Sequence, residues 1–415
     1  MSEMLTAAAI ALSAVAALEV VAFVATRWLK KGCPWIVTPG DLAPVVDHRG
    51  LERFIEHGWD AEIGWVRKPH TAHDETAKGG GTSRYHIDEK GARASPGFEN
   101  EPPVVLAYGD SYTFSRQVND DQTWPHGLSS LLGGRVANYG VGNYGIDQAL
   151  MRLEREFDDH PAPVVLMGFV PETICRVTSI WRHFSEYGNT FAFKPSFVLD
   201  GDGGLNLIPN PIDSPDKFRR IAGMLPWLKE RDFFYARKFK PDMLRFPYLW
   251  SLWRSRRRNL PLMAAAFSDR IGGDGKKAFC RVMERNITLT AELYREDAPL
   301  DLMVAIIERF AGFVSAKGAV PAVVILPQLY DLKRLRAGDH YYEPFVKRLA
   351  GTCAVADLGP MFTEDDDDAN NYIDDRYGGH FSAAGNEKVA RRLAEDLGLL
   401  IEKARASEPF KGDIS

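Results

Sequence analysis

The sequence has few cysteines and no marked excess of charge of either sign. Its four cysteines lie far apart and form no CxxC pair, so neither a zinc site nor a redox motif is indicated. A formal net charge of -5, with 26% charged and 45% hydrophobic residues, is close to the globular average and gives no sign of disorder or nucleic-acid binding. No cofactor or metal is indicated. With 415 residues the chain can bury one large core or two smaller ones, so its function must be inferred from local motifs.

The first thirty residues depart from this average composition. The run from Met4 to Val24 is almost wholly apolar, tryptophan and basic residues follow it, and about 20 apolar residues cross a bilayer as a helix. We therefore expect residues 1–31 to be a single-pass membrane anchor, with the side of the membrane undecided. A cleaved signal peptide is disfavoured, because Glu3 and no basic residue precede the run. A buried helix of a soluble protein stays open, because Glu19 would lie inside the bilayer.

Short apolar runs alternate with amphipathic segments from residue 101 onward. Continuous apolar runs are typical of parallel strands buried on both faces, and their alternation with helices predicts a parallel α/β sheet. Residues 32–100, which begin with a proline-bearing stretch, are expected to form a linker and a lead-in region. Residues 101–415 are expected to form one α/β domain with a helical and hairpin insertion at about 178–300. We predict strands at 104–108, 164–167, 322–326 and 354–357, and helices at 146–158, 302–316 and 387–403.

The predicted insertion contains two distinctive segments. Residues 197–199 and 205–207 flank a turn rich in aspartate and glycine and predict a β-hairpin, whereas the later ligands of a calcium loop are missing. Residues 245–258 mix tryptophans with arginines. This mixture suits either an amphipathic helix on anionic lipid or a cap helix packed on the core. Nucleic-acid binding is disfavoured by the acidic net charge.

Ser111 is the first candidate for chemistry. It follows the predicted strand 104–108 in the sequence Gly109-Asp110-Ser111, and so would lie at the carboxyl edge of the sheet, where open α/β folds bind ligands. A nucleophilic serine needs a sharp turn, a base within hydrogen-bond reach and donors for the oxyanion. Gly109 allows the turn, and the backbone N–H of Ser111 is suited to be one donor.

Two further segments hold residues that such a serine needs. Residues 138–148 form a glycine-rich turn before a predicted helix, which suits close approach of the backbone to a ligand. The glycines match the spacing of a dinucleotide-binding loop, but no ribose-binding acid is evident about 20 residues further on. Near the C-terminus, His380 lies on a predicted loop before the helix 387–403, from which it can act as a general base.

Together these segments resemble three blocks of the SGNH/GDSL family of serine hydrolases. Tyr108–Phe114, Asn138–Gln148 and Gly379–Asn386 are similar to the family's first, second and last blocks, in the same order. The resemblance covers about residues 104–177 and 322–399. It implies a three-layer α/β/α flavodoxin-like sandwich, and an activity among the esterases, lipases and saccharide O-acyltransferases.

The resemblance also implies roles for individual residues. Ser111 would be the nucleophile and His380 the base. The first oxyanion donor would be the backbone N–H of Ser111, and the second a backbone N–H of the glycine turn at Asn143, with Gly142 adjacent.

Two positions depart from the family's pattern. The family's third block supplies an asparagine side chain to the oxyanion hole, whereas Glu172 and Thr173 stand here. Thr173 would donate instead, or Glu172 would bind a substrate hydroxyl. The family's acid lies three residues before the histidine, where this chain has Tyr377. Asp375 or Asp374 would have to reach the histidine by a longer loop, and a Ser-His pair aided by a backbone carbonyl stays open.

These observations predict a membrane-anchored serine hydrolase or acyltransferase that acts on an ester or an acylated saccharide. The alternative is a catalytically weakened binding or assembly protein of polysaccharide modification on the same fold. The acyl group, the acceptor and the oligomeric state are not indicated by the sequence.

Overall fold

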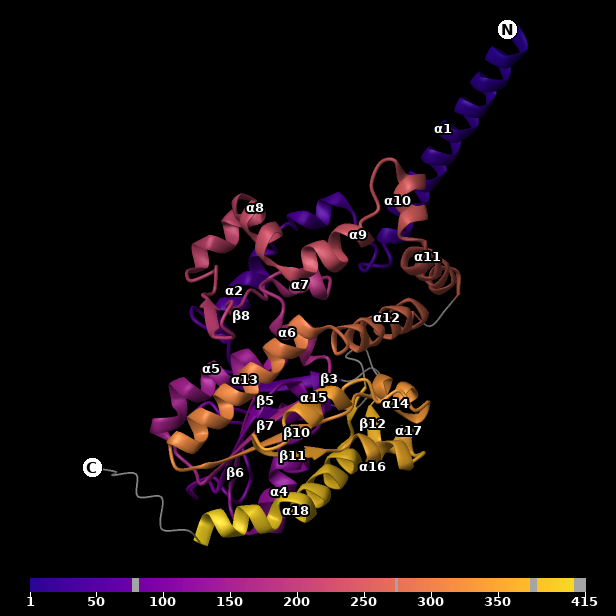
Figure 1. Ribbon diagram of the computed structural model, residues 1–415. Coiled ribbons are helices and arrows are strands. Elements are labelled where there is room, and N and C mark those ends of the chain that lie inside the picture. Colours follow the sequence, from indigo (N-terminus) through magenta and orange to yellow (C-terminus); the bar gives the residue numbers. More distant parts are fainter. Residues whose placement is uncertain (77–81, 273–274, 374–378, 407–415) are drawn as a thin grey trace. The chain divides into compact units, whose positions relative to one another are not determined.

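A computed structural model describes residues 1–76, 82–272, 275–373 and 379–406 (Figure 1). The chain divides into two compact units, each described by itself. The predicted insertion is shared between them, because residues 194–213 fold with the α/β unit and most of the remainder folds with the N-terminal helix. Unit 1 consists of Met1–His48, Ser179–Phe193 and Ser214–Asn286, and unit 2 of Arg49–Thr178, Lys194–Asp213 and Ile287–Ser415.

Unit 2 is built on a five-stranded sheet in which every neighbouring pair is parallel. Counted along the chain, the strands stand in the order 2-1-3-4-5, which is the flavodoxin-like arrangement. The apolar runs of the sequence form the strands of this sheet, as predicted, because both faces of the sheet are covered. The strands are β5 (Val105–Gly109), β6 (Val136–Gly140), β7 (Val164–Phe169), β10 (Val320–Ile325) and β11 (Ala354–Asp357).

Helices lie on both faces of this sheet (Figure 1). On one face α5 (Ile146–Glu156) packs against α13 (Asp297–Ala316), and on the other α4 (Trp124–Leu132) packs against α18 (Ala383–Ala406). The predicted three-layer sandwich is confirmed. The three predicted helices correspond to α5, α13 and α18, and each differs from its prediction by a few residues at its ends.

Strand β6 differs from the prediction, which assigned Asn138 to a glycine-rich turn. The polar side chain of Asn138 is buried inside the sheet, where its Oδ1 accepts a hydrogen bond from the backbone of Gly140 at 3.0 Å. Because this hydrogen bond satisfies the buried amide oxygen within the strand, Asn138 does not end the strand. The strand continues to Gly140, and the turn begins at Val141. The predicted hairpin forms with Leu199 opposite Leu205.

The remaining elements of unit 2 are short. Their strands form two-stranded antiparallel sheets separate from the central sheet, and β13 and α3 supply the residues that meet at the carboxyl ends of the central strands. They are α2 (His48–His57), β1 (Trp59–Asp60), β2 (Gly64–Trp65), β3 (Ala72–Thr76), β4 (Thr82–His86), α3 (Ser111–Phe114), α6 (Thr173–Val177), β8 (Ser196–Leu199), β9 (Leu205–Ile208), α14 (Leu329–Arg336), α15 (Glu343–Arg348), α16 (Gly359–Glu364), α17 (Asp368–Asn371), β12 (Tyr372–Ile373) and β13 (His380–Phe381).

Unit 1 contains the apolar N-terminal helix α1 (Ser2–Lys30), which is long and apolar enough to cross a membrane. None of its most apolar stretch is buried, whereas Leu29 near its end joins a hydrophobic cluster with Cys33 and Ile36. The start of the predicted linker is therefore packed, because these side chains are apolar and lie against Leu244 and Leu262. The other helices are α7 (Arg182–Ser185), α8 (Ile221–Arg231), α9 (Lys240–Asp242), α10 (Tyr248–Arg254), α11 (Arg256–Ile271) and α12 (Lys277–Leu293), which continues into unit 2.

Candidate active site

Ser111 lies directly after the first strand of the sheet, on a turn that requires glycine. Gly109 ends β5 with φ of 155°, and a Cβ at this position would lie 1.8 Å from the carbonyl oxygen of Gly168 in the neighbouring strand. No other residue fits so close to a backbone. After this turn Asp110 caps α3 by accepting a hydrogen bond from the backbone of Tyr112 at 2.8 Å. The side chain of Ser111 is thereby fixed at the carboxyl edge of the sheet.

His380, in the C-terminal part of unit 2, contacts Ser111. Its Nε2 lies 2.8 Å from the hydroxyl oxygen of Ser111. The imidazole stacks on the ring of Tyr112, with centroids 4.6 Å apart, and the Tyr112 hydroxyl donates to the carbonyl of Gly379 at 2.6 Å. Both contacts hold the ring in the orientation that points Nε2 at the serine.

The environment of His380 favours its neutral form. Burial, assisted by the positive charges of Arg116 and Arg176, lowers the pKa of His380 from 6.5 to about 3. A neutral imidazole with its proton on Nδ1 presents a lone pair at Nε2, which is the form that accepts a proton from serine. The geometry and the neutral form therefore suit a group that accepts a proton from Ser111, whereas the burial that lowers the pKa also makes His380 a weaker base.

The acid of the predicted triad is not placed. Asp375, its alternative Asp374, and Tyr377 lie outside the described residues. Among the residues that the structure describes, Nδ1 of His380 has no hydrogen-bond partner. The described part of the site is therefore a Ser-His pair.

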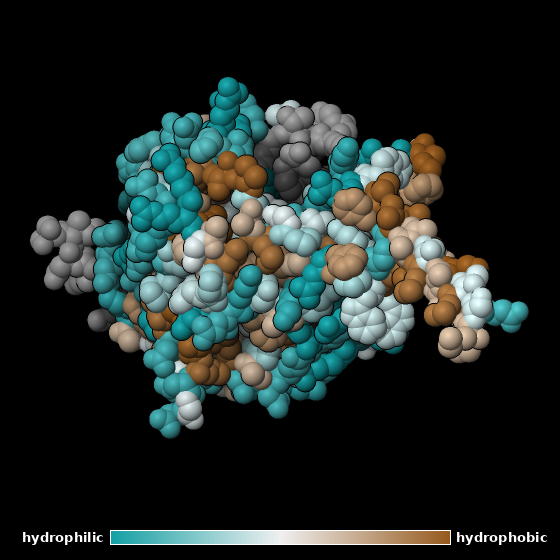
Figure 2. Space-filling model, turned by 90° about the horizontal axis from the view of Figure 1, so that it is seen from above, coloured by the Kyte–Doolittle hydropathy of each residue, from teal (hydrophilic) through white to brown (hydrophobic). Residues whose placement is uncertain are grey.

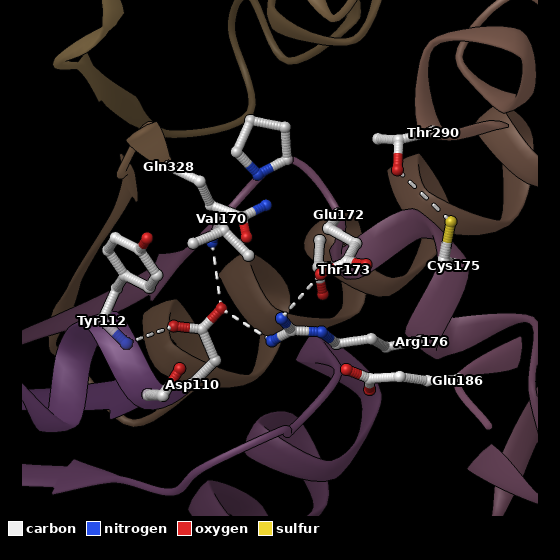
Figure 3. A network of polar contacts seen from close by, with 12 residues as sticks. Asp110, Tyr112, Val170, Glu172, Thr173, Cys175, Arg176, Glu186, Thr290 and Gln328 are labelled. Atoms are coloured by element: carbon white, nitrogen blue, oxygen red, sulfur yellow. Dashed lines mark hydrogen bonds and ion pairs between the residues drawn. The ribbon is translucent and has the colours of Figure 1, made fainter. Parts of the chain in front are cut away.

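Asp110 anchors a buried ion-pair network beside the serine (Figure 3). Its Oδ2 accepts hydrogen bonds from the backbone of Val170 and from Nη1 of Arg176, both at 3.0 Å. Nη2 of Arg176 in turn contacts Glu172 at 3.2 Å, so two buried carboxylates share one guanidinium. Burial raises the pKa of Asp110, and Arg176 opposes this rise. The network ties the end of β7 to the nucleophile turn.

Glu172 and Thr173 both make hydrogen bonds within the protein. Glu172 is paired with Arg176, as described above. The hydroxyl of Thr173 is fully buried and accepts a hydrogen bond from the backbone of Ile146, at the start of α5, at 3.2 Å. Neither side chain presents the amide donor that an asparagine would supply at this position.

The second predicted donor region follows β6. A Cβ on Gly140 would lie 2.2 Å from the backbone nitrogen of Phe114, so the strand end passes against α3 with no room for a side chain. The turn then reverses at Asn143, whose φ is 67°, and the carbonyl of Gly142 is held by the indole N–H of Trp65 at 2.9 Å. Gly142 and Asn143 thus lie on a fixed turn after the strand next to β5.

Gln328 is a buried polar residue of this region that the sequence analysis does not identify. In the sheet Ile325 of β10 stands opposite Phe169 of β7, so the segments that follow the two strands emerge at the same edge. The backbone N–H of Leu326, just after β10, donates to the carbonyl of Phe169 at the end of β7 at 2.9 Å, so Gln328 follows closely on a segment held against β7. The amide nitrogen of Gln328 is buried, and no partner for it exists among the described residues. The only sequence signal is its place just after a predicted strand.

Asp331 is a second residue that the sequence analysis misses. It is fully buried, and it accepts hydrogen bonds from the backbone of Gln328 and from the hydroxyl of Tyr341, both at 2.8 Å. Burial raises its pKa to about 7, and the negative charge of Glu172 adds to this rise. Asp331 therefore fixes the loop that carries Gln328.

Within the described ranges no cluster of three potential ligands for a metal ion occurs.

Comparisons with known proteins found likeness in structure alone. No protein-family model matches the sequence, and no curated protein matches it either. A solved structure from Desulfitobacterium hafniense, assigned to a lipolytic G-D-S-L family, is similar at 12% identity over 71% of this chain and 98% of its own, with a TM-score of 0.29. Unit 2 has the fold that the SGNH/GDSL resemblance implies, because its sheet has the 2-1-3-4-5 strand order and a serine after the first strand meets a histidine before the last helix.

Proposed function

We propose that unit 2 is a serine-dependent ester hydrolase or acyltransferase. The observation that carries this proposal is the 2.8 Å contact between the Ser111 hydroxyl and Nε2 of His380, at the carboxyl edge of a parallel sheet. A serine hydroxyl is a weak nucleophile until a base accepts its proton, and a neutral imidazole at hydrogen-bond distance is such a base.

The proposed reaction follows from this pair. As Ser111 Oγ attacks the carbonyl carbon of an ester, its proton passes to Nε2 of His380, and the carbonyl oxygen becomes an oxyanion. The imidazolium then returns the proton to the departing alcohol, which leaves an acyl-serine. Water, or the hydroxyl of an acceptor, attacks the acyl-serine with His380 again as base. Hydrolysis and transfer differ only in this last nucleophile, so one site serves both.

Three donors are proposed for the oxyanion. Two are backbone N–H groups, that of Ser111 and one from the turn at Gly142 and Asn143. We assign the third to the side-chain amide of Gln328, because its nitrogen is buried and has no partner among the described residues, whereas Glu172 is paired with Arg176. The hydroxyl of Thr173 is the alternative third donor, because it accepts a hydrogen bond from Ile146 and keeps its own proton to donate. An unpartnered buried amide is costly unless a ligand satisfies it.

The substrate class that we propose is a small acyl ester or an acylated saccharide. The direct test is release of p-nitrophenol from p-nitrophenyl acetate by the purified protein, with Ser111→Ala as the control that should lose turnover. Transfer would be scored by mass spectrometry as an acyl group gained by an added oligosaccharide. Turnover of the parent that equals that of Ser111→Ala would reject catalysis by this pair.

One observation favours a second candidate, a binding protein on the same fold. Glu172 stands where the family that this chain resembles has an asparagine, and two carboxylates share the charge of Arg176 near the reacting atoms. Negative charge at this place opposes an oxyanion. A protein that binds an acylated saccharide with equal affinity before and after Ser111→Ala, and that turns over no ester, would have this second function.

A further inference from the structure

Unit 1 exposes a set of large apolar side chains on the segment that begins before α10 and on α11. Phe246 is 76% exposed, and Trp250 and Trp253 are more than half exposed and stack on each other at 5.1 Å. Leu260 and Phe267 of α11 are also exposed. Exposed apolar groups of this number mark a contact surface.

The helices α10 and α11 lie beside the apolar helix α1 (Figure 1). The ring of Phe23 contacts that of Tyr248 at 5.4 Å, and the ring of Trp28 contacts that of Phe267 at 6.0 Å. Figure 2 shows hydrophobic residues, in brown, along the projecting α1 on the right of the view. The apolar surface of α1 is thus continuous with that of α10 and α11.

Glu19, the acidic residue within the apolar run, is bound by α10. Its carboxylate accepts hydrogen bonds from the backbone N–H groups of Tyr248 and Leu249, at 2.6 and 3.0 Å. Those N–H groups belong to the first turn of a helix and have no partner within it. An acidic side chain in an apolar helix is costly inside a bilayer unless polar groups satisfy it, and α10 supplies such groups.

The length of α1 determines how deep in a bilayer Glu19 and the start of α10 would lie. A bilayer has an apolar layer of about 30 Å, which a helix crosses in about 20 residues, so a span that begins at Met4 ends near Phe23. Glu19 then lies roughly 6 Å inside the layer, at four residues of about 1.5 Å each. The residues from Met4 to Leu18 alone would cover only about 22 Å, which is too short. The start of α10 must therefore share the apolar layer with Glu19.

The charges around α10 fit an anionic lipid surface. Arg254, Arg256 and Arg257 follow the two stacked tryptophans and are exposed. The guanidinium of Arg256 also lies 4.9 Å from the centre of the Trp253 ring. Tryptophan at the boundary of the apolar layer, followed by arginine at the level of the headgroups, is the arrangement found at membrane interfaces.

We propose that α10, with Phe246 before it, enters the membrane beside α1, and that the occupant of this surface is a bilayer containing anionic lipid. The anchor is then a helix pair joined through Glu19, and not a lone helix. The segment 245–258 is, on this proposal, a lipid contact. The proposal concerns unit 1 alone and does not rest on the proposed function of unit 2.

The test uses the full chain reconstituted in phosphatidylcholine vesicles with and without phosphatidylglycerol. Benzoylphenylalanine, which cross-links to neighbouring C–H bonds on illumination, replaces one residue at a time. Trp250 is the test position. Leu12 of α1 reports whether the anchor is inserted, and Glu230 of α8 is the control for exposure to water, since its side chain is 72% exposed.

The proposal expects lipid adducts at positions 12 and 250 and at least tenfold fewer at position 230, with the yield at 250 higher when phosphatidylglycerol is present. Adducts at position 12 without adducts at 250 would overturn it and leave α1 as a lone anchor. Absence of adducts at both positions, or equal yields at 250 and 230, would overturn it as well. Ester hydrolysis by the same vesicles is scored separately, so failure of either proposal is recognised independently.

Discussion

The hydroxyl of Ser111 and Nε2 of His380 lie 2.8 Å apart, although the two residues are separated by 269 positions in the chain. The fold brings them together. The first strand of the sheet ends at the turn that carries Ser111, and His380 lies just before α18, which packs on the same unit. If the two side chains act as one nucleophilic unit, the loss of either should have nearly the same effect as the loss of both.

The first prediction concerns this unit. Ser111→Ala and His380→Ala should each lower esterase kcat by at least about 1,000-fold, and the double variant should be scarcely slower than either. A fluorophosphonate probe should label the parent at Ser111 and leave His380→Ala unlabelled. Ser115→Ala is the matched control, because Ser115 ends the same helix and should retain full labelling when replaced. Labelling of the Ser111→Ala variant would place the nucleophile elsewhere.

The second prediction concerns pH. Because the pKa of His380 is lowered to about 3, the free enzyme holds the imidazole neutral at pH 5, and kcat/KM should show no acidic limb near 6.5. In the unfolded chain His380 takes up a proton near pH 6.5, whereas in the folded chain it stays neutral down to about pH 3. The free energy of unfolding should therefore fall as the pH drops below 6.5. A pH profile of kcat/KM and urea unfolding at several pH values measure the two effects.

An acidic limb between about pH 6 and 7 would contradict this prediction and point to a carboxylate facing Nδ1. Asp375 is the residue proposed for that role. Asp375→Asn distinguishes the cases, since it should remove such a limb if Asp375 is the acid and leave the profile unchanged if the Ser-His pair acts without one.

The part of the site that could be predicted lies in contiguous motifs. Gly109, Ser111 and His380 stand in short segments whose residue types have a local meaning, namely a tight turn, a nucleophile and a base. The strands were predictable for the same reason, because burial on both faces leaves an unbroken apolar run. Strand β6 was missed, because Asn138 satisfies its amide locally in a way that only the folded sheet reveals.

The rest depends on contacts between distant segments. Arg176 meets Asp110 across 66 positions, and nothing near either residue predicts the pair. Gln328 comes near the end of β7 only because β10 lies next to β7. Glu19 looked like an argument against a membrane helix, whereas its partners lie 229 and 230 positions away in α10. The partners of polar residues that are buried or lie in an apolar run therefore cannot be predicted from the sequence, because they come from distant segments.

The third prediction concerns Arg176. Replacing it with methionine leaves Asp110 and Glu172 buried without their shared cation, and removal of one partner of a buried ion pair costs about 3–5 kcal/mol. Arg309→Met is the matched control: Arg309 pairs with Glu154 at 2.7 Å on the surface, where such a pair contributes about 0–1 kcal/mol. Urea unfolding of both variants measures the difference. Equal losses would mean that the network does not stabilise the turn.

The fourth prediction concerns Gln328. If its amide N–H donates to the oxyanion, Gln328→Ala should lower kcat by about 100- to 1,000-fold. KM should change little, because the amide nitrogen has no partner to lose among the described residues, and the free energy of unfolding should fall only by the cost of the space that the buried side chain leaves. Gln328→Glu keeps the size of the side chain, replaces the amide donor and adds a negative charge when ionised, so it should be at least as slow as Gln328→Ala. A Gln328→Glu variant with the kcat of the parent would assign the third donor elsewhere.

The fifth prediction concerns the end of α1. Leu29 packs in the hydrophobic cluster of unit 1 with Leu244 and Leu262, whereas residues 1–18 are exposed along their whole length. Deletion of residues 1–18 should therefore leave unit 1 folded and release the chain from membranes into carbonate extracts. Deletion of residues 1–31 also removes Leu29, and loss of a buried leucine side chain costs about 2–5 kcal/mol.

The longer deletion should accordingly unfold at lower temperature or lower urea concentration than the shorter one. Leu29→Ala in the shorter chain should reproduce most of the difference, which separates the loss of packing from the loss of length. Exposed Leu18→Ala in the full chain is the matched control and should leave stability unchanged. Identical unfolding midpoints for the two deletions would show that α1 contributes nothing to the core of unit 1, and that its last turns are held there only loosely.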